Sequence, residues 1–220
     1  RAQLHFYRDH IRDLLGPVKL ASVTPQYIAK VLNRAYENKL SEQTRLHIYS
    51  LLRKAFGDAI EIFHLLHVSP VHKSFKPKLP QKEARFLTIE EVRKLLLFAE
   101  GKPYEIAVWL GAYMGLRVGE IQALRWEDID FGRQVLHIRR TYARAENIIR
   151  EYPKGRRHHS HRIPSELFIK LQDLQKTENR EFVAAPSGCR MLDYSRYRRK
   201  LLKYCKEAGV RQIATHGLRH

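Results

Sequence analysis

Two short segments of the sequence place an arginine beside a residue that could help it to bind a phosphate. In GLRVGEIQALRWEDID (115–130), Arg117 stands among apolar residues, where an arginine is costly unless it meets an anion. Glu120 lies three residues further on, so it would share a helix face with Arg117 and could hold its side chain. The second segment, HGLRH at the end of the sequence, puts His216 and Arg219 three residues apart. Arginine offers a phosphate two directed donors, and histidine adds a further donor or a proton relay.

A third segment, YPKGRRHHSHRIP (152–164), is a basic turn between two predicted strands. Lys154 at its tip could reach into a DNA groove. Each of the three motifs alone also fits a plainer structure, namely a surface ion pair, a basic helix end or an exposed loop lysine. The sequence has no HExxH motif, and the HHSH run (158–161) has no cysteine pair near it, so we predict neither a metal site nor a cofactor.

Hydrophobic periodicity predicts that helices carry most of these segments. Thr24 caps a helix whose first residue is proline, and Ser41 opens a longer helix that fades at His67. A capping box of Thr88 and Glu91 begins another helix. Further helices are expected over residues 103–114, 117–126, 165–176 and 193–208, and strands over 134–142, 146–153 and 159–164. The expected fold is mainly α with a small antiparallel β-sheet (α+β).

The stretch SPVHKSFKPKLPQKEAR (69–85) separates the two halves of this pattern. It holds three prolines and five basic residues but few apolar ones, as an extended linker does. We therefore expect a helical domain over residues 1–72, a linker over 73–84 and a second domain over 85–220.

The charge of the chain points to a polyanionic partner. Its 220 residues carry 41 Lys and Arg against 23 Asp and Glu, a formal net charge of +18. Both halves contribute, with 13 basic against 6 acidic residues up to Lys78 and 28 against 17 after it. A positive field of this size makes nucleic acid the first candidate. The residues expected to contact DNA are Arg139, Arg140, Arg156, Arg157, Arg162, Arg196, Arg199 and Lys200.

Composition excludes several other classes of protein. With 44% hydrophobic residues the chain is not a disordered basic tail. It has no apolar run of the length that crosses a membrane, so we predict no membrane partner. Two cysteines cannot build a disulfide framework, which fits a reducing compartment, and we expect a cytoplasmic location.

Taken in order, the three motifs resemble the tyrosine recombinase (phage integrase) family. GLRVGEIQALRWEDID resembles the first arginine box of that family, the 152–164 turn its lysine-bearing β-turn, and HGLRH its second box. The helical segment and linker ahead of them resemble the SAM-like core-binding domain of the family. The resemblance covers nearly the whole chain and implies that residues 85–220 form the catalytic domain.

The resemblance also implies a role for each motif residue. Arg117 and Arg219 would be the paired catalytic arginines, with Glu120 supporting Arg117. His216 would be the active-site histidine, and Lys154 the general acid, although its basic neighbours in the turn compete for that place. The implied activity is site-specific recombination or integration by a phage or mobile element. DNA would be cleaved and rejoined through a 3′-phosphotyrosyl intermediate, without a cofactor.

In the family, the nucleophilic tyrosine lies beyond the second box. His220, which matches a family histidine that is more often structural, ends this sequence, and Tyr194, Tyr197 and Tyr204 precede the box. We therefore expect a chain truncated before its nucleophile, which binds double-stranded DNA but does not cleave it. The full-length protein is expected to act as a homotetramer on paired sites.

Three alternatives remain open from the sequence. A type IB topoisomerase-like enzyme would share this active site but relax supercoils without choosing a site. A non-catalytic DNA-binding accessory factor would share the fold and not need Arg117. An RNA-binding protein is favoured by the charge alone, because no RNA motif of stacking aromatic residues is visible.

Overall fold

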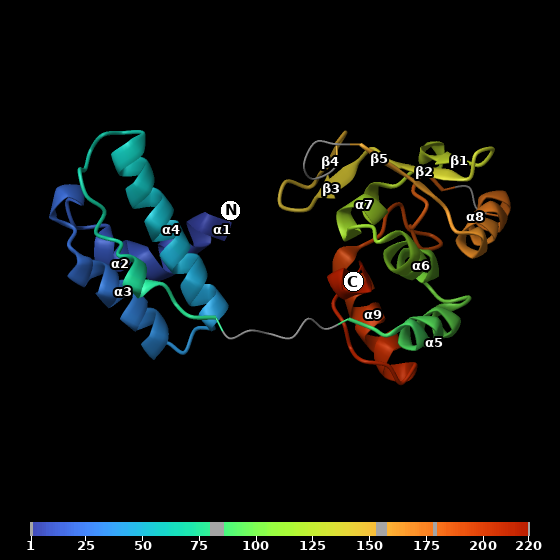
Figure 1. The fold of residues 1–220 in the computed structure, drawn as a ribbon, viewed down its shortest axis with the longest axis horizontal. Coiled ribbons are helices and arrows are strands. Elements are labelled where there is room, and N and C mark those ends of the chain that lie inside the picture. Colours follow the sequence, from blue (N-terminus) through green and yellow to red (C-terminus); the bar gives the residue numbers. More distant parts are fainter. Residues whose placement is uncertain (1, 80–85, 153–157, 178–179, 220) are drawn as a thin grey trace. The chain divides into compact units, whose positions relative to one another are not determined.

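The computed structural model describes residues 2–79, 86–152, 158–177 and 180–219. The chain divides into two compact units, Arg1–Lys82 and Glu83–His220. This division falls within the segment expected to be a linker. Figure 1 shows helices in both units, and all the strands that the structure describes belong to the second.

The first unit is helical. Its elements are α1 (Ala2–Phe6), a π-helical turn (Tyr7–Ile11), α2 (Arg12–Leu15), α3 (Pro25–Glu37) and α4 (Glu42–Glu61), with 3₁₀ turns at Leu20–Ser22 and Lys73–Phe75. The start of α4 is as predicted, because the Ser41 side chain accepts a hydrogen bond from the backbone N–H of Thr44 at 3.2 Å.

The end of α4 differs from the prediction. The helix stops at Glu61 rather than near His67. The carbonyl of Ala59 accepts from the backbone N–H of Leu65, and His64 between them takes a left-handed φ of 50°. A left-handed residue after the last turn closes a helix and satisfies carbonyls that would otherwise lack partners. The apolar residues beyond Glu61 therefore do not extend the helix.

Apolar residues at helical spacing hold the first unit together. Ile28 and Val31 of α3 are fully buried and face Ile48 and Leu52 of α4 in one core cluster. Val71 belongs to the same cluster, and the 3₁₀ turn Lys73–Phe75 packs against it through its phenylalanine. Part of the segment expected to be a linker is thus bound to the first unit.

The second unit combines helices with two small sheets. Its helices are α5 (Ile89–Ala99), α6 (Glu105–Met114), α7 (Val118–Ala123), α8 (Ser165–Thr177) and α9 (Tyr194–Glu207), with 3₁₀ turns at Trp126–Asp128 (η4) and Thr215–Arg219 (η5). Its strands are β1 (Ile129–Asp130), β2 (Val135–Ile138), β3 (Thr141–Ala143), β4 (Ile148–Arg150) and β5 (His159–Arg162). The expected α+β fold is confirmed.

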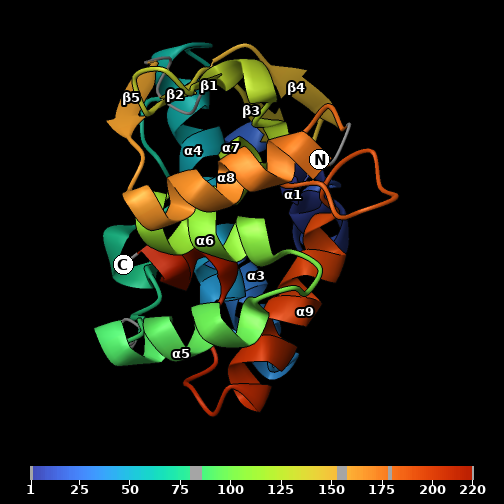
Figure 2. The same ribbon diagram turned by 90° about the vertical axis from the view of Figure 1, so that its right-hand side faces the viewer.

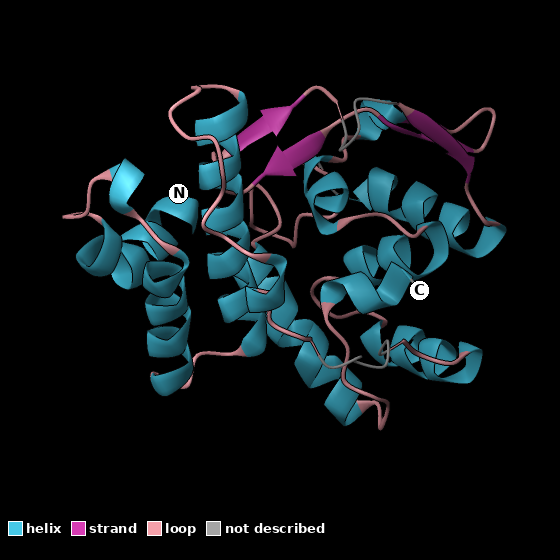
Figure 3. Ribbon diagram, turned by 60° about the vertical axis from the view of Figure 1, so that its left-hand side comes forward, coloured by secondary structure: helices cyan, strands magenta, loops and turns pink. Residues whose placement is uncertain are grey.

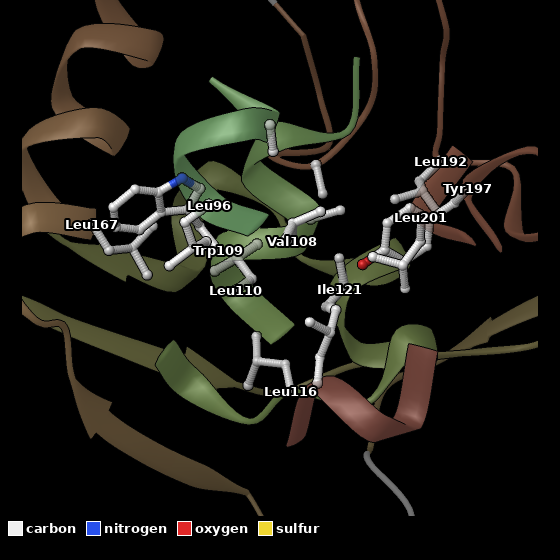
Figure 4. Close-up of a cluster of buried hydrophobic side chains, with 14 of the residues drawn as sticks. Leu96, Val108, Trp109, Leu110, Leu116, Ile121, Leu167, Leu192, Tyr197 and Leu201 are labelled. Atoms are coloured by element: carbon white, nitrogen blue, oxygen red, sulfur yellow. The ribbon is translucent and has the colours of Figure 1, made fainter. Parts of the chain in front are cut away.

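Helix α6 is the centre of this unit. It lies between α5 and α8 and also contacts α7 and η5 (Figure 2). Residues Ala107–Gly111 of α6 are all buried, as expected of a helix that is covered on every side. Figure 4 shows Val108, Trp109 and Leu110 among leucines of neighbouring segments. A helix enclosed in this way is a rigid base for the segments at its C-terminal end.

The strands are arranged differently from the prediction. The expected strand 134–142 is two strands, with Arg139 and Arg140 between them. In one sheet the order is β1-β2-β5, all antiparallel, and β3 and β4 form a separate two-stranded sheet, here called the ribbon (Figure 3). The basic turn 152–164 was expected to join two strands as a hairpin. It follows β4 and contains β5, and these two strands belong to different sheets.

Candidate phosphate-binding site

Arg117 is fixed at the start of α7 by a buried carboxylate. Glu120 is 4% exposed, and its Oε1 accepts from the Arg117 Nη1 at 2.9 Å. Its Oε2 accepts from the Arg117 backbone N–H at 2.7 Å, so the same carboxylate also caps the helix. The side chain of Arg117 is 40% exposed. The predicted contact is present, and it leaves the guanidinium held on one side and open to solvent on the other.

Two glycines let the second box approach α6 closely. A β-carbon on Gly111 would lie 3.1 Å from Cδ1 of Leu218, so any larger residue there would require Leu218 to shift by a few tenths of an ångström. Gly115, which ends α6 with a left-handed φ of 60°, lies against Cγ of Arg219. Because Arg117 follows Gly115 by two residues, the side chains of Arg117 and Arg219 start from neighbouring points.

His216 and Arg219 both lie in η5 and are both exposed. Residues three apart in a 3₁₀ helix lie directly above one another, so they project from the same side. Buried Leu218 anchors the turn on the core. The corner formed by the end of α6, the start of α7 and η5 therefore carries three of the four residues predicted to be catalytic.

The fourth, Lys154, lies outside the described residues, as do Arg156, Arg157 and His220. The nearest described residue before Lys154 is Tyr152, which directly follows Glu151. The structure thus describes how the chain enters the basic turn.

The remaining residues predicted to bind DNA lie on two elements. Arg162 is exposed on β5, and Arg196, Arg199 and Lys200 are exposed on α9. Asp193 caps α9, accepting from the backbone N–H of Arg196 at 2.6 Å. Exposed cations of this kind are free to meet phosphates without breaking a buried contact.

Arg140 is placed unlike the others. Its guanidinium donates through Nη1 to both oxygens of Asp128 at 3.0 Å, through Nη2 to Glu127 at 2.5 Å, and through Nε to Glu151 at 2.8 Å. The side chain is only 12% exposed. This argues against the predicted phosphate contact, because every edge of the guanidinium already faces a carboxylate. Arg139, with 46% of its side chain exposed, remains accessible and lies 3.9 Å from Asp128.

The sequence did not predict that Glu91 accepts a hydrogen bond from the loop that precedes the second box. Beside capping α5, its Oε1 accepts from the backbone N–H of Arg211 at 3.2 Å. These backbone donors, Thr88 first and then Arg211, lower the pKa of Glu91 below its ordinary value of 4.5. The loop that leads into η5 is thereby fastened to the first helix of the second unit. The capping box predicted only the local half of this arrangement.

The tyrosines that precede the second box are engaged elsewhere. Tyr197 is 1% exposed, and burial raises its pKa. Burial likewise raises the pKa of Tyr204, whose hydroxyl donates to the Pro103 carbonyl at 2.6 Å. The ring of Tyr194 lies under the guanidinium of Arg144, 3.6 Å from its centre. None of the three is exposed as a free nucleophile.

The second unit also contains a cavity that is separate from this corner. A cavity of about 330 Å³ lies between the α5–α6 connection and the segment 180–187, and no predicted catalytic residue lines it. Within the part of the chain that the structure describes, His, Cys, Asp and Glu do not gather in threes in a way that would hold a metal ion. A helix with the length and apolarity to cross a bilayer is likewise not found among the described residues.

The second unit of this basic chain carries two arginines and a histidine at one corner, a set of donors whose chemistry suits a phosphate. Residues 85–220 match the family model described as the phage integrase family. This match covers more than half of the chain, which therefore belongs to the phage integrase family, the tyrosine recombinases.

Individual relatives agree with this assignment. A tyrosine recombinase XerC-like protein of Caldanaerobacter subterraneus subsp. tengcongensis is 24% identical over 247 residues, which cover 97% of this chain and 63% of the relative. A putative prophage phiRv2 integrase of Mycobacterium tuberculosis is 29% identical over 236 residues, covering 100% of this chain and 61% of the relative. The chain thus spans somewhat over three fifths of these relatives.

Solved structures share the fold. The Tn1549 transposon integrase in complex with transposon right end DNA has a TM-score of 0.81 at 18% identity, over 99% of this chain and 76% of that one. A lambda integrase tetramer bound to a Holliday junction has a TM-score of 0.73 at 21% identity, over 99% of this chain and 63% of that one. At these identities the likeness concerns the fold.

Proposed function

We propose that this chain is the DNA-binding and phosphate-activating part of a site-specific recombinase or integrase of a phage or mobile element. The observation that carries the proposal is the corner at which Arg219 packs on Gly115, two residues before the Glu120-anchored Arg117. Both units are basic, and the relatives named above are recombinases and integrases. Double-stranded DNA is the proposed substrate.

In the proposed reaction, a tyrosine oxygen attacks the scissile phosphorus and forms a 3′-phosphotyrosyl bond. The bond from phosphorus to the 5′ oxygen breaks, and its electron pair leaves with that oxygen. Arg117 and Arg219 hold the non-bridging oxygens as negative charge grows on them, and His216 donates to the same phosphate. Arginines fixed before the reaction supply the positive charge that metal ions supply in other phosphoryl-transfer enzymes.

Lys154 is the proposed general acid for the leaving 5′ oxygen. An ammonium with an ordinary pKa of about 10.4 is charged at neutral pH and can give up its proton to a developing alkoxide. The reverse reaction rejoins the strand, because the energy of the broken bond is kept in the phosphotyrosine. No ATP is required.

The test uses a chain that continues beyond His220 through the family's tyrosine, and a DNA duplex nicked near the cleavage site so that the product is trapped. We expect a covalent protein–DNA adduct that survives detergent. Arg117→Ala should slow its formation by about 10²–10³-fold while leaving DNA affinity within a few-fold. Arg150→Ala, which removes a partly exposed arginine paired with Glu146, is the control.

The outcomes separate the candidate functions. An unchanged rate of strand exchange in Arg117→Ala would support the accessory-factor alternative. Adducts on any sequence, with relaxation of supercoils and no exchange between paired sites, would support a topoisomerase. Loss of binding to duplex DNA in favour of RNA would contradict the proposal as a whole.

The assembly and location follow from the same proposal. Lambda integrase is a tetramer on its Holliday junction, and we propose a homotetramer on paired sites for the complete protein here. A protein that acts on a phage or bacterial chromosome works in the cytoplasm, which we propose as its location.

A further inference from the structure

We propose that Arg144 reads a guanine in the major groove of the DNA site, and that Tyr194 is the positioning residue that holds Arg144 for this contact. The inference rests on the proposed function, because it needs duplex DNA as the substrate. It deepens that function by naming a residue that selects the DNA sequence.

The guanidinium of Arg144 is held on an aromatic ring. Its central carbon lies 3.6 Å from the centre of the Tyr194 ring, which is van der Waals contact. Arginine stacks well on aromatic rings because its charged group is planar, and the attraction between the cation and the ring adds to the contact. The ring therefore covers one face of the guanidinium, while the N–H groups point outward along its edges.

These edges are open to a ligand. Arg144 is exposed, and among the residues that the structure describes it donates to no acceptor and pairs with no carboxylate. Glu146 in the same turn pairs with Arg150, and Asp193 caps α9. Arg140 is the opposite case, because carboxylates already take its donors. Arg144 thus offers DNA the donors that Arg140 does not.

Arg144 lies where the ribbon meets the start of α9. It directly follows β3 in the turn of the ribbon, and Tyr194 is the first residue of α9. A hollow of about 300 Å³ beside the stack is lined by Tyr142 and Arg144 of the ribbon, by residues 191–195 and by Gln122 of α7. The major groove of B-DNA admits an α-helix or a two-stranded ribbon, so both elements suit it.

The stack adjoins a surface expected to bind DNA. Arg198 lies one turn after Tyr194 on the same side of α9 and is exposed. The solvent side of the helix carries the exposed cations that were predicted to contact DNA, Arg196, Arg199 and Lys200. The ribbon itself packs on α7, where Gly119 approaches Thr141, two residues after Arg117. Arg144 is therefore carried by elements that are fixed relative to the phosphate-binding corner.

A guanidinium held in one plane suits guanine best among the bases. Guanine presents two acceptors, O6 and N7, side by side in the major groove, and arginine donates to both at once. A phosphate also accepts two such bonds, but it carries no sequence information. Because Tyr194 orders the side chain before DNA arrives, less entropy is lost on binding, and both bonds form in a plane that is already set.

The test begins with the complete protein, which selects duplexes from a random library. Kd is then measured for the selected site and for copies in which each G·C pair in turn is replaced. For the wild type we expect one guanine whose replacement weakens binding by about 5-fold to 150-fold, the range of a bidentate contact. For Arg144→Ala, the same replacement should change Kd by less than about twofold.

Two further variants of arginine separate charge from geometry. Arg144→Lys keeps the charge but not the planar fork, so it should lose the preference for guanine while keeping the salt dependence of binding. Arg150→Ala is the matched control, because Arg150 is a partly exposed arginine of the ribbon that is already paired with Glu146. It should keep the preference of the wild type.

Tyr194→Leu tests the positioning role. Loss of the ring should lower the preference for guanine by about 2-fold to 5-fold, as expected for an exposed cation–π contact, and should add nothing in the Arg144→Ala background. Tyr194→Phe keeps the ring and should match the wild type. The readout compares two DNA sequences on one protein, so a general loss of stability does not imitate it. Urea unfolding of each variant verifies that it is folded.

The outcomes separate this inference from the proposed function. If Arg144→Ala weakens binding to all sequences alike and lowers the slope of log K against log salt by about 0.9, Arg144 contacts a phosphate and reads no base. Base reading is also wrong if Arg144→Ala keeps the preference, or if the wild type prefers no guanine. Full preference in Tyr194→Leu would contradict the positioning role. In all these cases the proposed function stands. A complete protein that binds no duplex DNA would overturn the proposed function, and the inference with it.

Discussion

Cγ of Arg219 lies 3.5 Å from the point at which a β-carbon on Gly115 would stand. This contact joins the second arginine box to the first at a residue with no side chain of its own. It explains how two motifs a hundred residues apart come to share a corner. The contact requires a left-handed backbone conformation at Gly115, whose φ is 60°.

Gly115→Ala should therefore destabilise the second unit. A left-handed conformation costs an L-residue about 1–2 kcal/mol relative to glycine. The added methyl group would meet the Arg219 stem only at van der Waals distance, so the backbone strain accounts for the loss. Urea unfolding should show a loss in this range. Gly132→Ala, at a glycine without a positive φ, should stay within about 0.5 kcal/mol of wild type. Equal stability of the two variants would contradict the strain argument.

Gly119→Ala should disturb the ribbon. A β-carbon there would lie 2.7 Å from Oγ1 of Thr141 and 2.9 Å from the carbonyl oxygen of Tyr142, and the latter cannot rotate away. Overpacking of this kind typically costs about 1–3 kcal/mol. Unfolding measurements should show that loss, and hydrogen exchange should rise in β3. Adding Thr141→Ala should recover only part of the loss, since the carbonyl remains in place.

Asp128→Ala should be among the most damaging substitutions of a charged residue. It leaves the nearly buried Arg140 short of its main partner and removes the acceptor for the backbone N–H of Arg125. Breaking a buried pair in this way typically costs about 3–5 kcal/mol. Glu127→Ala removes a carboxylate that is 57% exposed, so its effect should stay below about 1 kcal/mol. If thermal and urea unfolding showed similar losses of stability for Asp128→Ala and Glu127→Ala, the difference expected from burial would be contradicted.

Glu91 should give the second unit an acid-sensitive contact. Its pKa in the folded state is lowered by the backbone N–H groups of Thr88 and Arg211. The stabilisation is therefore complete above the unfolded value near 4.5 and is lost as the pH falls through the lowered pKa. Glu91→Gln should flatten stability against pH below 4.5 and leave its slope above pH 6 unchanged. If stability fell equally with pH below 4.5 in the wild type and in Glu91→Gln, Glu91 would not have this role.

Arg199→Ala should weaken DNA binding without changing sequence preference. An exposed arginine on α9 that meets one phosphate releases about one counterion, so the slope of log K against log salt should fall by about 0.9. Binding titrations at several salt concentrations measure this slope. Lys176→Ala, on α8 and paired with Asp173, should leave it unchanged. A loss confined to one DNA sequence would show base reading instead.

The sequence predicted the parts of the fold that depend on local signals. The helix starts at Ser41 and Thr88 were correct because a capping side chain acts within three residues. The division of 134–142 into two strands was missed, because it depends on Arg140 meeting carboxylates that are distant in the chain. The pairing of β2 with β5 is also long-range, and adjacent strands would ordinarily be expected to pair.

The candidate site shows the same limit. The Arg117–Glu120 contact could be predicted because the residues are three apart on one helix. That the guanidinium of Arg140 is surrounded by carboxylates, and is not open to a phosphate, could not be predicted. A list of basic residues does not show which of them face carboxylates. The approach of Arg219 to Gly115 follows from tertiary packing. The sequence hints at it through glycines spaced four residues apart, at 111, 115 and 119.

The separate pairing of β3 with β4 has a consequence for protein engineering. Because β2 bonds directly to β5, the main sheet is complete without the ribbon, which follows the end of β2 at Ile138 and precedes the start of β5 at His159. The register of β2 and β5 therefore does not depend on the pairing of β3 with β4. Shortening the ribbon, or replacing its tip, should leave the three-stranded sheet intact.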